Sequence, residues 1–192
     1  MSDDHNEPGE PGDPSSHNAP GAPAGPEGIS GPEGAPGIAG PETIAEPATI
    51  EERKRRLAVL GRVVPHNAAL GIRRLDVTAT EVFLELPYDP KLVGNPETGT
   101  IHGGAITALL DACSGRAVFA SLAQPVPIAT LDLRIDYLKP AEPGKSVFAR
   151  ATCYKLTRNV AFTRAVAYQD DPEDAVAHSV GTFMLSTKKG TP

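Results

Sequence analysis

One carboxylate stands alone in an apolar stretch of this chain. The segment at 105–115 follows a His-Gly-Gly sequence at 102–104, and its only charged residue is Asp111. Burying an unpaired carboxylate is costly, so an acid in an apolar helix is kept only where something compensates its charge or uses it. Asp111 is therefore the first candidate for chemistry.

Asp111 shares one side of a predicted helix with polar and small residues. Steps of three and four place Thr107, Ser114 and Val118 on its side, while the larger apolar side chains mark another side. The acid is thus presented on a face and is not surrounded by leucines. The alternative is a structural carboxylate that is satisfied by a neighbouring hydroxyl or by an arginine of a partner subunit.

The His-Gly-Gly sequence lies where this helix begins. The first N–H groups of a helix have no intrahelical partners and lie at the positive end of its dipole, so they can hold an oxygen that becomes negative. Gly103 and Gly104 also lack the Cβ atoms that would keep a carbonyl group away.

Several elements must position these residues. A capping box at Thr49 and Glu52 predicts a first helix that extends to about Val63. The apolar side of that helix is predicted at Ile50, Leu57, Leu60 and Val64. Its basic run at 53–56 is interpreted as a solvated face, because a lone helix without a partner helix does not read DNA.

Strand patterns surround the central helix. Strands are predicted at 70–77, 80–87, 128–138, 145–157, 160–169 and 176–187, with a loop over 88–101 and the helix over about 102–122. Strands separated by two to five residues are mostly antiparallel, and a helix that is apolar nearly all round must be covered on several sides. An α+β fold with one curved antiparallel sheet around one helix meets both demands.

This arrangement resembles the PaaI-like (phenylacetate-pathway) branch of the hotdog-fold acyl-CoA thioesterases, in the 4-hydroxybenzoyl-CoA thioesterase superfamily. The resemblance covers about residues 50–187 and rests on the His-Gly-Gly sequence, the acid nine residues after His102, and a long strand that ends in Tyr-Leu-Lys-Pro-Ala at 137–141. It implies hydrolysis of an acyl-CoA to a carboxylic acid and CoA, no cofactor and no metal, and a homodimer or homotetramer.

The resemblance also implies roles for the site residues. Asp111 acts as a general base or as a nucleophile, and the Gly103 N–H polarises the thioester carbonyl. His102 shapes the oxyanion site and orients Asn95, which positions the water or the carbonyl; alternatively, His102 only fixes its loop and Asn95 only forms a turn. One extra residue separates Asn95 from His102 relative to the family.

Thr130 occupies the place of a hydroxyl that faces the acid in the family. Strict strand alternation would instead put Thr130 on the side of Asp132, opposite Leu131. A bulge or a subunit boundary would be needed to bring Thr130 to the site.

For coenzyme A, the resemblance points to the strand end at 137–142 and to the hairpin turn at 156–160. The expected substrate and coenzyme contacts are Gly104, Thr107, Ser114, Tyr137, Lys139, Thr157, Arg158 and Asn159. Arg158 suits bidentate recognition of phosphate oxygens, and the alternative is a solvent-exposed turn residue.

Composition separates an N-terminal arm from the folded part. Residues 1–46 hold nine Pro, nine Gly and nine acidic residues without Lys or Arg, so they cannot bury enough surface to fold. Glycines recur there at every third residue from 25 to 40, but six triplets are too few for a collagen helix. We expect a disordered arm at 1–46, a domain at 47–188 and a flexible end at 189–192.

Charge, targeting segments and cysteine content limit the location and the partners that the chain can have. From residue 47 onward, 15 acidic groups stand against 18 basic groups, which is too weakly basic to indicate a nucleic-acid partner. No signal peptide or membrane-spanning run is present, so we expect a soluble, cytoplasmic protein without a membrane partner. Cys113 and Cys153 are expected to be reduced and buried.

Two other functions belong to related folds. A non-catalytic acyl-CoA sensor would keep the pocket, but such regulators carry an N-terminal DNA-binding module, and only one helix precedes the fold here. A hotdog hydratase places a His and an acid together on the central helix, whereas this helix interior has no His.

Overall fold

The computed structural model describes residues 49–60, 64–124 and 126–185. The elements are α1 (Ile50–Leu60), α2 (Pro65–Ala69), β1 (Arg73–Val77), β2 (Glu81–Leu86), the 3₁₀ turn η1 (Pro90–Leu92), β3 (Val93–Asn95), β4 (Thr100–Ile101), α3 (Gly103–Ser121), β5 (Ile128–Tyr137), β6 (Val147–Leu156), β7 (Val160–Tyr168) and β8 (Ala177–Leu185). The predicted arm at 1–46, the end of the first helix at 61–63 and the C-terminal 189–192 lie outside the described residues.

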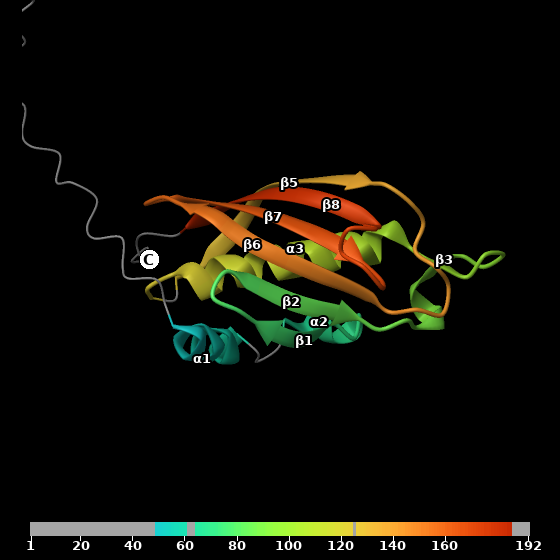
Figure 1. The fold of residues 1–192 in the computed structure, drawn as a ribbon, viewed down its shortest axis with the longest axis horizontal. Helices are drawn as coiled ribbons and strands as arrows, with labels where there is room; N and C mark the ends of the chain where they lie inside the picture. Colours follow the sequence, from blue (N-terminus) through green and yellow to red (C-terminus); the bar gives the residue numbers. More distant parts are fainter. Residues whose placement is uncertain (1–48, 61–63, 125, 186–192) are drawn as a thin grey trace, which may run out of the picture. The chain divides into compact units, whose positions relative to one another are not determined.

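Six strands form one antiparallel sheet in the order β1-β2-β6-β7-β8-β5. Helix α3 runs along one face of this sheet and packs chiefly on β2, β6 and β7 (Figure 1). The predicted α+β hotdog fold, with a curved sheet around one central helix, is confirmed. None of the helices among the described residues is long and apolar enough to cross a membrane.

The packing follows the sequence patterns. Val82, Leu84 and Leu86 alternate along β2 and are fully buried against the helix side of the sheet. In α3, apolar residues are buried along the whole helix, and the Cys113 thiol donates to the Val82 carbonyl at 3.3 Å. Burial raises the pKa of this thiol to about 12.

Strand β5 lies at one edge of the sheet and carries a bulge. Thr130 pairs with Phe183 of β8, and Asp132 pairs with the adjacent Thr182, so that Leu131 is the extra residue. A bulge shifts the alternation of side chains by one residue. Because of this shift, the Thr130 side chain lies on the face of the sheet that contacts α3, and not on the face that strict alternation predicted.

The predicted loop at 88–101 is more ordered than expected. It holds η1 and the small hairpin of β3 and β4, and the strand predicted from residue 70 begins at Arg73, after the short helix α2. Elements of two to five residues are too short to show a hydrophobic period, which explains why the sequence did not indicate them.

Three side chains in the first part of the chain differ from the expectation. Ile50 and Val64 are exposed although an apolar face was predicted there, whereas Arg53, predicted as solvated, is only 4% exposed. The Arg53 guanidinium donates to the Ala120 carbonyl at 3.4 Å because α1 packs against the end of α3.

Both cysteines are free thiols, but they differ in burial. Cys113 is fully buried, as predicted, whereas Cys153 is only half-buried.

Candidate active site

The N-terminus of α3 is capped by His102. The His102 Nδ1 accepts a hydrogen bond from the Gly104 N–H at 2.9 Å, and the backbone N–H of His102 donates to the Leu92 carbonyl at 2.8 Å. A ring nitrogen that accepts is unprotonated, so a neutral His102 carries its proton on Nε2. His102 therefore fixes the start of the helix.

The peptide between Gly103 and Gly104 is held at both ends. While the Gly104 N–H binds His102, the Gly103 carbonyl accepts from the Tyr137 hydroxyl at 2.7 Å. The same hydroxyl lies 2.9 Å from the Thr107 hydroxyl. Because the Tyr137 proton is used on Gly103, Thr107 is the donor of this second bond.

Close neighbours leave little room for a side chain at either glycine. A Cβ on Gly103 would lie 3.2 Å from the Tyr137 hydroxyl, and one on Gly104 would lie 2.9 Å from the His102 Nδ1. The Gly103 N–H has no hydrogen-bond partner among the described residues. Of the N–H groups of the two glycines, the Gly103 N–H is therefore the one that could bind a ligand oxygen.

Asp111 lies two turns further along α3. Its Oδ1 accepts a hydrogen bond from the Thr130 hydroxyl at 2.8 Å, and its side chain is half-buried. The β5 bulge directly after Thr130 makes this contact possible. The structure thus brings together the acid and the hydroxyl that the resemblance pairs.

The two halves of the site are separated within one chain. Asp111 follows Gly103 by eight positions, which corresponds to about 12 Å along the helix axis. The contacts with β5 repeat this separation, since Tyr137 reaches Gly103 and Thr130 reaches Asp111.

A cavity of about 320 Å³ opens beside the N-terminus of α3. Its walls are formed by Thr100, Ile101, Gly103, Ile106, Tyr137, Leu138, Lys139, Pro140 and Ala141. Small-molecule sites usually measure about 300–1,000 Å³ and are mainly apolar with few polar groups, as here.

Asn95 closes its own turn. Its side-chain oxygen accepts from the Glu97 N–H at 3.0 Å, its carbonyl accepts from the Gly99 N–H at 2.9 Å, and the residue is exposed. No hydrogen bond joins Asn95 to His102 in the described part of the chain. This geometry is the turn-forming alternative of the sequence analysis.

Gly94 is a site residue that the sequence reasoning missed. A Cβ at this position would lie 2.8 Å from the His102 Cα, so the β3–β4 hairpin can approach the helix start only with glycine there. The glycine itself was the available signal, but a turn-rich segment explains a glycine equally well.

Two residues predicted on the Asp111 face turn inward. Ser114 and Val118 are fully buried, and the Ser114 hydroxyl has no partner within the described residues. Thr107, in contrast, is half-buried and lies between Gly103 and Asp111.

The predicted coenzyme contacts fall at opposite ends of the sheet. Lys139 follows the Tyr137 end of β5 and pairs with Asp174, whereas the turn at 157–159 lies at the Ile128 end, where Leu185 donates to the Asn159 carbonyl at 2.7 Å. Thr157 is used within the turn, because its hydroxyl accepts from the Val160 N–H at 3.1 Å. Arg158 is exposed and has no partner among the described residues.

Comparison with known families places this chain beside the thioesterases. A model of the Thioesterase superfamily matches residues 98–176, which include the helix start, Asp111 and the sheet strands β5 to β7.

Two curated relatives are also similar. The medium/long-chain acyl-CoA thioesterase YigI of Escherichia coli is 27% identical over 135 residues, which are 64% of this chain and 86% of YigI. A Halobacterium salinarum protein, provisionally named an esterase, is 40% identical over 75 residues, which are 38% of this chain. This match spans half the length of the Halobacterium protein.

Solved structures extend the similarity to the fold. A Pseudomonas aeruginosa protein is 44% identical, with a TM-score of 0.61, over 71% of this chain and 98% of that one. The Escherichia coli PaaI protein of the phenylacetic acid degradation operon has a TM-score of 0.65 over 74% of this chain and 99% of its own, at 15% identity, and so shows the fold alone.

Proposed function

Since this chain belongs to the thioesterase superfamily and is a thioester hydrolase with the hotdog fold, we propose that it hydrolyses acyl-CoA at Asp111. The observation that carries the proposal is the Asp111 carboxylate, which is held by Thr130 on a helix whose first N–H has no partner in the part of the chain that the structure describes. The substrate class is supported by the similarity to the acyl-CoA thioesterase YigI.

The proposed reaction uses the carboxylate and the helix N-terminus together. As a general base, Asp111 takes a proton from water, and the resulting hydroxide attacks the thioester carbon. The carbonyl oxygen becomes an oxyanion that accepts from the Gly103 N–H. The tetrahedral intermediate then collapses, the C–S bond breaks, and the CoA thiolate takes up the proton that Asp111 removed, which restores the carboxylate.

Asp111 can also act as the nucleophile. In that route its carboxylate oxygen displaces CoA and forms an anhydride, which water cleaves in a second step. The hydrogen bond from Thr130 orients the carboxylate in both routes.

Distance supports a site built from two chains. The reacting carbon must lie about 3–3.5 Å from its attacking group, with the oxyanion donor at hydrogen-bond distance on the other side. About 12 Å of helix between Gly103 and Asp111 exceeds that span. We therefore assign the acid of one subunit to the His-Gly-Gly loop of another, in a homodimer or a homotetramer.

The edge of the sheet supports this assembly. Strand β5 is ten residues long and lies at the edge, and its Leu131 and Tyr137 are about half exposed. A long edge strand with free backbone groups pairs readily with another strand. The residues that contact Asp111 and Gly103, which are Thr130 and Tyr137, both belong to this edge strand.

His102 and Asn95 are proposed as positioning groups. His102 caps the helix and thereby aims the Gly103 N–H, and Asn95 shapes the hairpin that leads into it. Arg158, which is free among the described residues, is proposed to contact a CoA phosphate, and Lys139 would have to leave Asp174 to do so.

The test is an assay of CoA release with a thiol reagent over a panel of acyl-CoAs. We expect Asp111→Asn to keep the fold and to lower kcat by at least about 100-fold, the usual scale for losing a general base. Glu51→Gln is the matched control, because it removes one exposed carboxylate from α1, outside the site. A variant at Asp111 that retains the wild-type rate would show that Asp111 is not the catalytic group, whereas a wild type that releases no CoA would favour a ligand-binding protein over an enzyme.

A further inference from the structure

The segment after β5 forms a wall of the cavity but has little regular structure. Residues 138–141 line the cavity, and the chain then turns through Pro143 and Gly144, which has a φ of +80°. Residues 138–146 belong to no helix or strand. Its start is held by the backbone, because the N–H groups of Leu138 and Lys139 donate to the Val176 carbonyl at 2.9 Å and 3.4 Å. Side-chain contacts are therefore needed chiefly at its far end.

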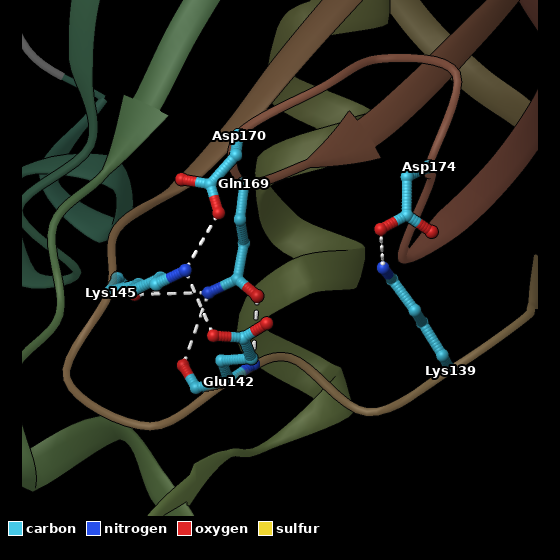
Figure 2. A network of polar contacts seen from close by, with 6 residues as sticks. All are labelled: Lys139, Glu142, Lys145, Gln169, Asp170 and Asp174. Atoms are coloured by element: carbon cyan, nitrogen blue, oxygen red, sulfur yellow. Dashed lines mark hydrogen bonds and ion pairs between the residues drawn. The ribbon is translucent and has the colours of Figure 1, made fainter.

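Gln169, at the end of β7, holds the far end of the segment. Its Oε1 accepts from the Glu142 N–H at 2.7 Å, while its Nε2 donates to the carbonyls of Glu142 at 3.1 Å and Lys145 at 3.4 Å (Figure 2). Gln169 as a whole is 8% exposed. A primary amide offers both a donor and an acceptor at one place, which is what these backbone groups need.

Ion pairs surround this amide but contribute less than it does to the stability of the segment's position. Lys145 pairs with Asp170 at 2.7 Å and with Glu142 at 2.9 Å, and Lys139 pairs with Asp174 (Figure 2). These groups are largely exposed, where ion pairs add little stability. The buried amide is thus the main contact that sets the position of the far end of the segment.

The clamped turn also contacts the other side of the site. A Cβ on Gly99 would lie 3.1 Å from the Pro143 Cβ, so the turn abuts the β3–β4 hairpin. The Gly99 carbonyl accepts from the Tyr88 hydroxyl at 2.9 Å. The segment bound by Gln169 therefore lies between the end of β7 and the β3–β4 hairpin, which leads into His102.

We propose that Gln169 is a positioning residue that fixes the far end of the cavity wall, at 141–142, and thereby sets acyl-CoA binding. Gln169 lies outside the cavity lining and acts through Glu142 and Ala141. The role rests on the proposed function, because the cavity is taken as the substrate site. Disturbing the amide should change KM and acyl preference while the reacting groups stay in place.

Gln169→Glu tests this role with a side chain of the same shape. The carboxylate keeps the acceptor for the Glu142 N–H but places a second oxygen against two carbonyl oxygens. We expect KM for bulky acyl-CoAs to rise about tenfold near pH 8, with kcat within about threefold of wild type. Protonation restores a donor, so KM of the variant, but not of the wild type, should recover as the pH falls.

Two controls separate positioning from general destabilisation. Asp170→Asn removes an exposed ion pair of the same network and should leave KM unchanged. Leu57→Ala, in α1, lowers stability without touching the cavity and should also leave KM unchanged. Gln169→Met, without polar groups, replaces Gln169→Glu if that variant does not fold.

The dissociation constant of a non-hydrolysable acyl-CoA thioether is measured in parallel, so the role is tested even if the wild type hydrolyses nothing. A wild type that binds the thioether without hydrolysing acyl-CoA would overturn the proposed function alone. The positioning role is overturned if Gln169→Glu lowers Tm but keeps wild-type KM, acyl preference and thioether affinity, or if the wild type does not bind the thioether.

Discussion

The Thr130 hydroxyl is the direct partner of the proposed catalytic acid. A hydrogen bond to a charged group contributes about 1.5–3 kcal/mol, and this one holds Asp111 at 2.8 Å. We expect Thr130→Val to lower kcat by roughly 10- to 100-fold with little change in KM, because the carboxylate loses its orientation. Thr130→Ser keeps the hydroxyl and should retain most of the rate. Equal rates for the Val and Ser variants would contradict this role.

The Cys113 thiol makes stability depend on pH in the alkaline range. Burial raises its pKa from 9.0 to about 12, so the unfolded chain loses this proton at lower pH than the folded chain. The unfolded state then binds fewer protons, and the free energy of unfolding falls as pH rises from 9 toward 12, by about 1.4 kcal/mol per pH unit.

Urea unfolding of the wild type and of Cys113→Ala, at about pH 8 and about pH 10.5, measures this effect. The Ala variant should be less stable at the lower pH but should lose less stability between the two. Cys153 is present in both proteins, so the difference between them isolates Cys113. The same loss in both proteins would show that this thiol is not the source.

At the scale of elements, two glycines differ in how much room they have for a side chain. A Cβ on Gly94 would lie 2.8 Å from backbone of His102, whereas one on Gly115 would make ordinary contacts of 3.7 Å with Ile128 and Phe183. We expect Gly94→Ala to lower both Tm and activity, because the hairpin must move from the helix start. Gly115→Ala should stabilise α3 by about 0.5–1 kcal/mol, the usual difference between Ala and Gly in a helix. Similar melting temperatures for the two variants would contradict this contrast.

The sequence predicts the long elements well because each has a clear period or boundary. The alternation in β2 and the apolar length of α3 are visible in single residues such as Leu84 and Leu109, and both are buried as expected. The β3–β4 hairpin has too few residues for any period. Its place against the helix depends on Gly94, whose packing only the folded chain reveals.

The candidate site was predictable only in part for a similar reason. Asp111 and the His-Gly-Gly sequence are local signals, but the contact of Thr130 with Asp111 depends on a bulge that alternation cannot indicate. The Gln169 clamp was not predicted at all. A single polar residue at a strand end carries no sign that it will bind the backbone of a segment more than 20 residues away.

For the whole molecule, the central question is whether one chain holds a complete site. The acid and the oxyanion donor lie two helical turns apart on α3, and their strand contacts, Thr130 and Tyr137, are separated in the same way along β5. A symmetric dimer through the β5 edge would create two equal sites, each taking Asp111 from one chain and Gly103 from the other.

Mixing two inactive variants distinguishes a shared site from a site within one chain. Gly103→Pro removes the Gly103 N–H, and proline suits this position because it is the first residue of α3 and His102 is extended, with φ −63° and ψ 133°. Its added ring atoms must displace the Tyr137 hydroxyl slightly, since a Cβ there would lie 3.2 Å away. Asp111→Asn removes the acid instead.

If the site is shared, a heterodimer of the two variants has one site with both defects and one with none. Random mixing makes half of the dimers heterodimers, so about a quarter of the wild-type activity should return when the variants are unfolded and refolded together. Each variant refolded alone is the control and should remain inactive. If both variants refold and exchange subunits, but the mixture stays inactive, then Asp111 and Gly103 act within one chain, and the distance argument drawn from α3 is wrong.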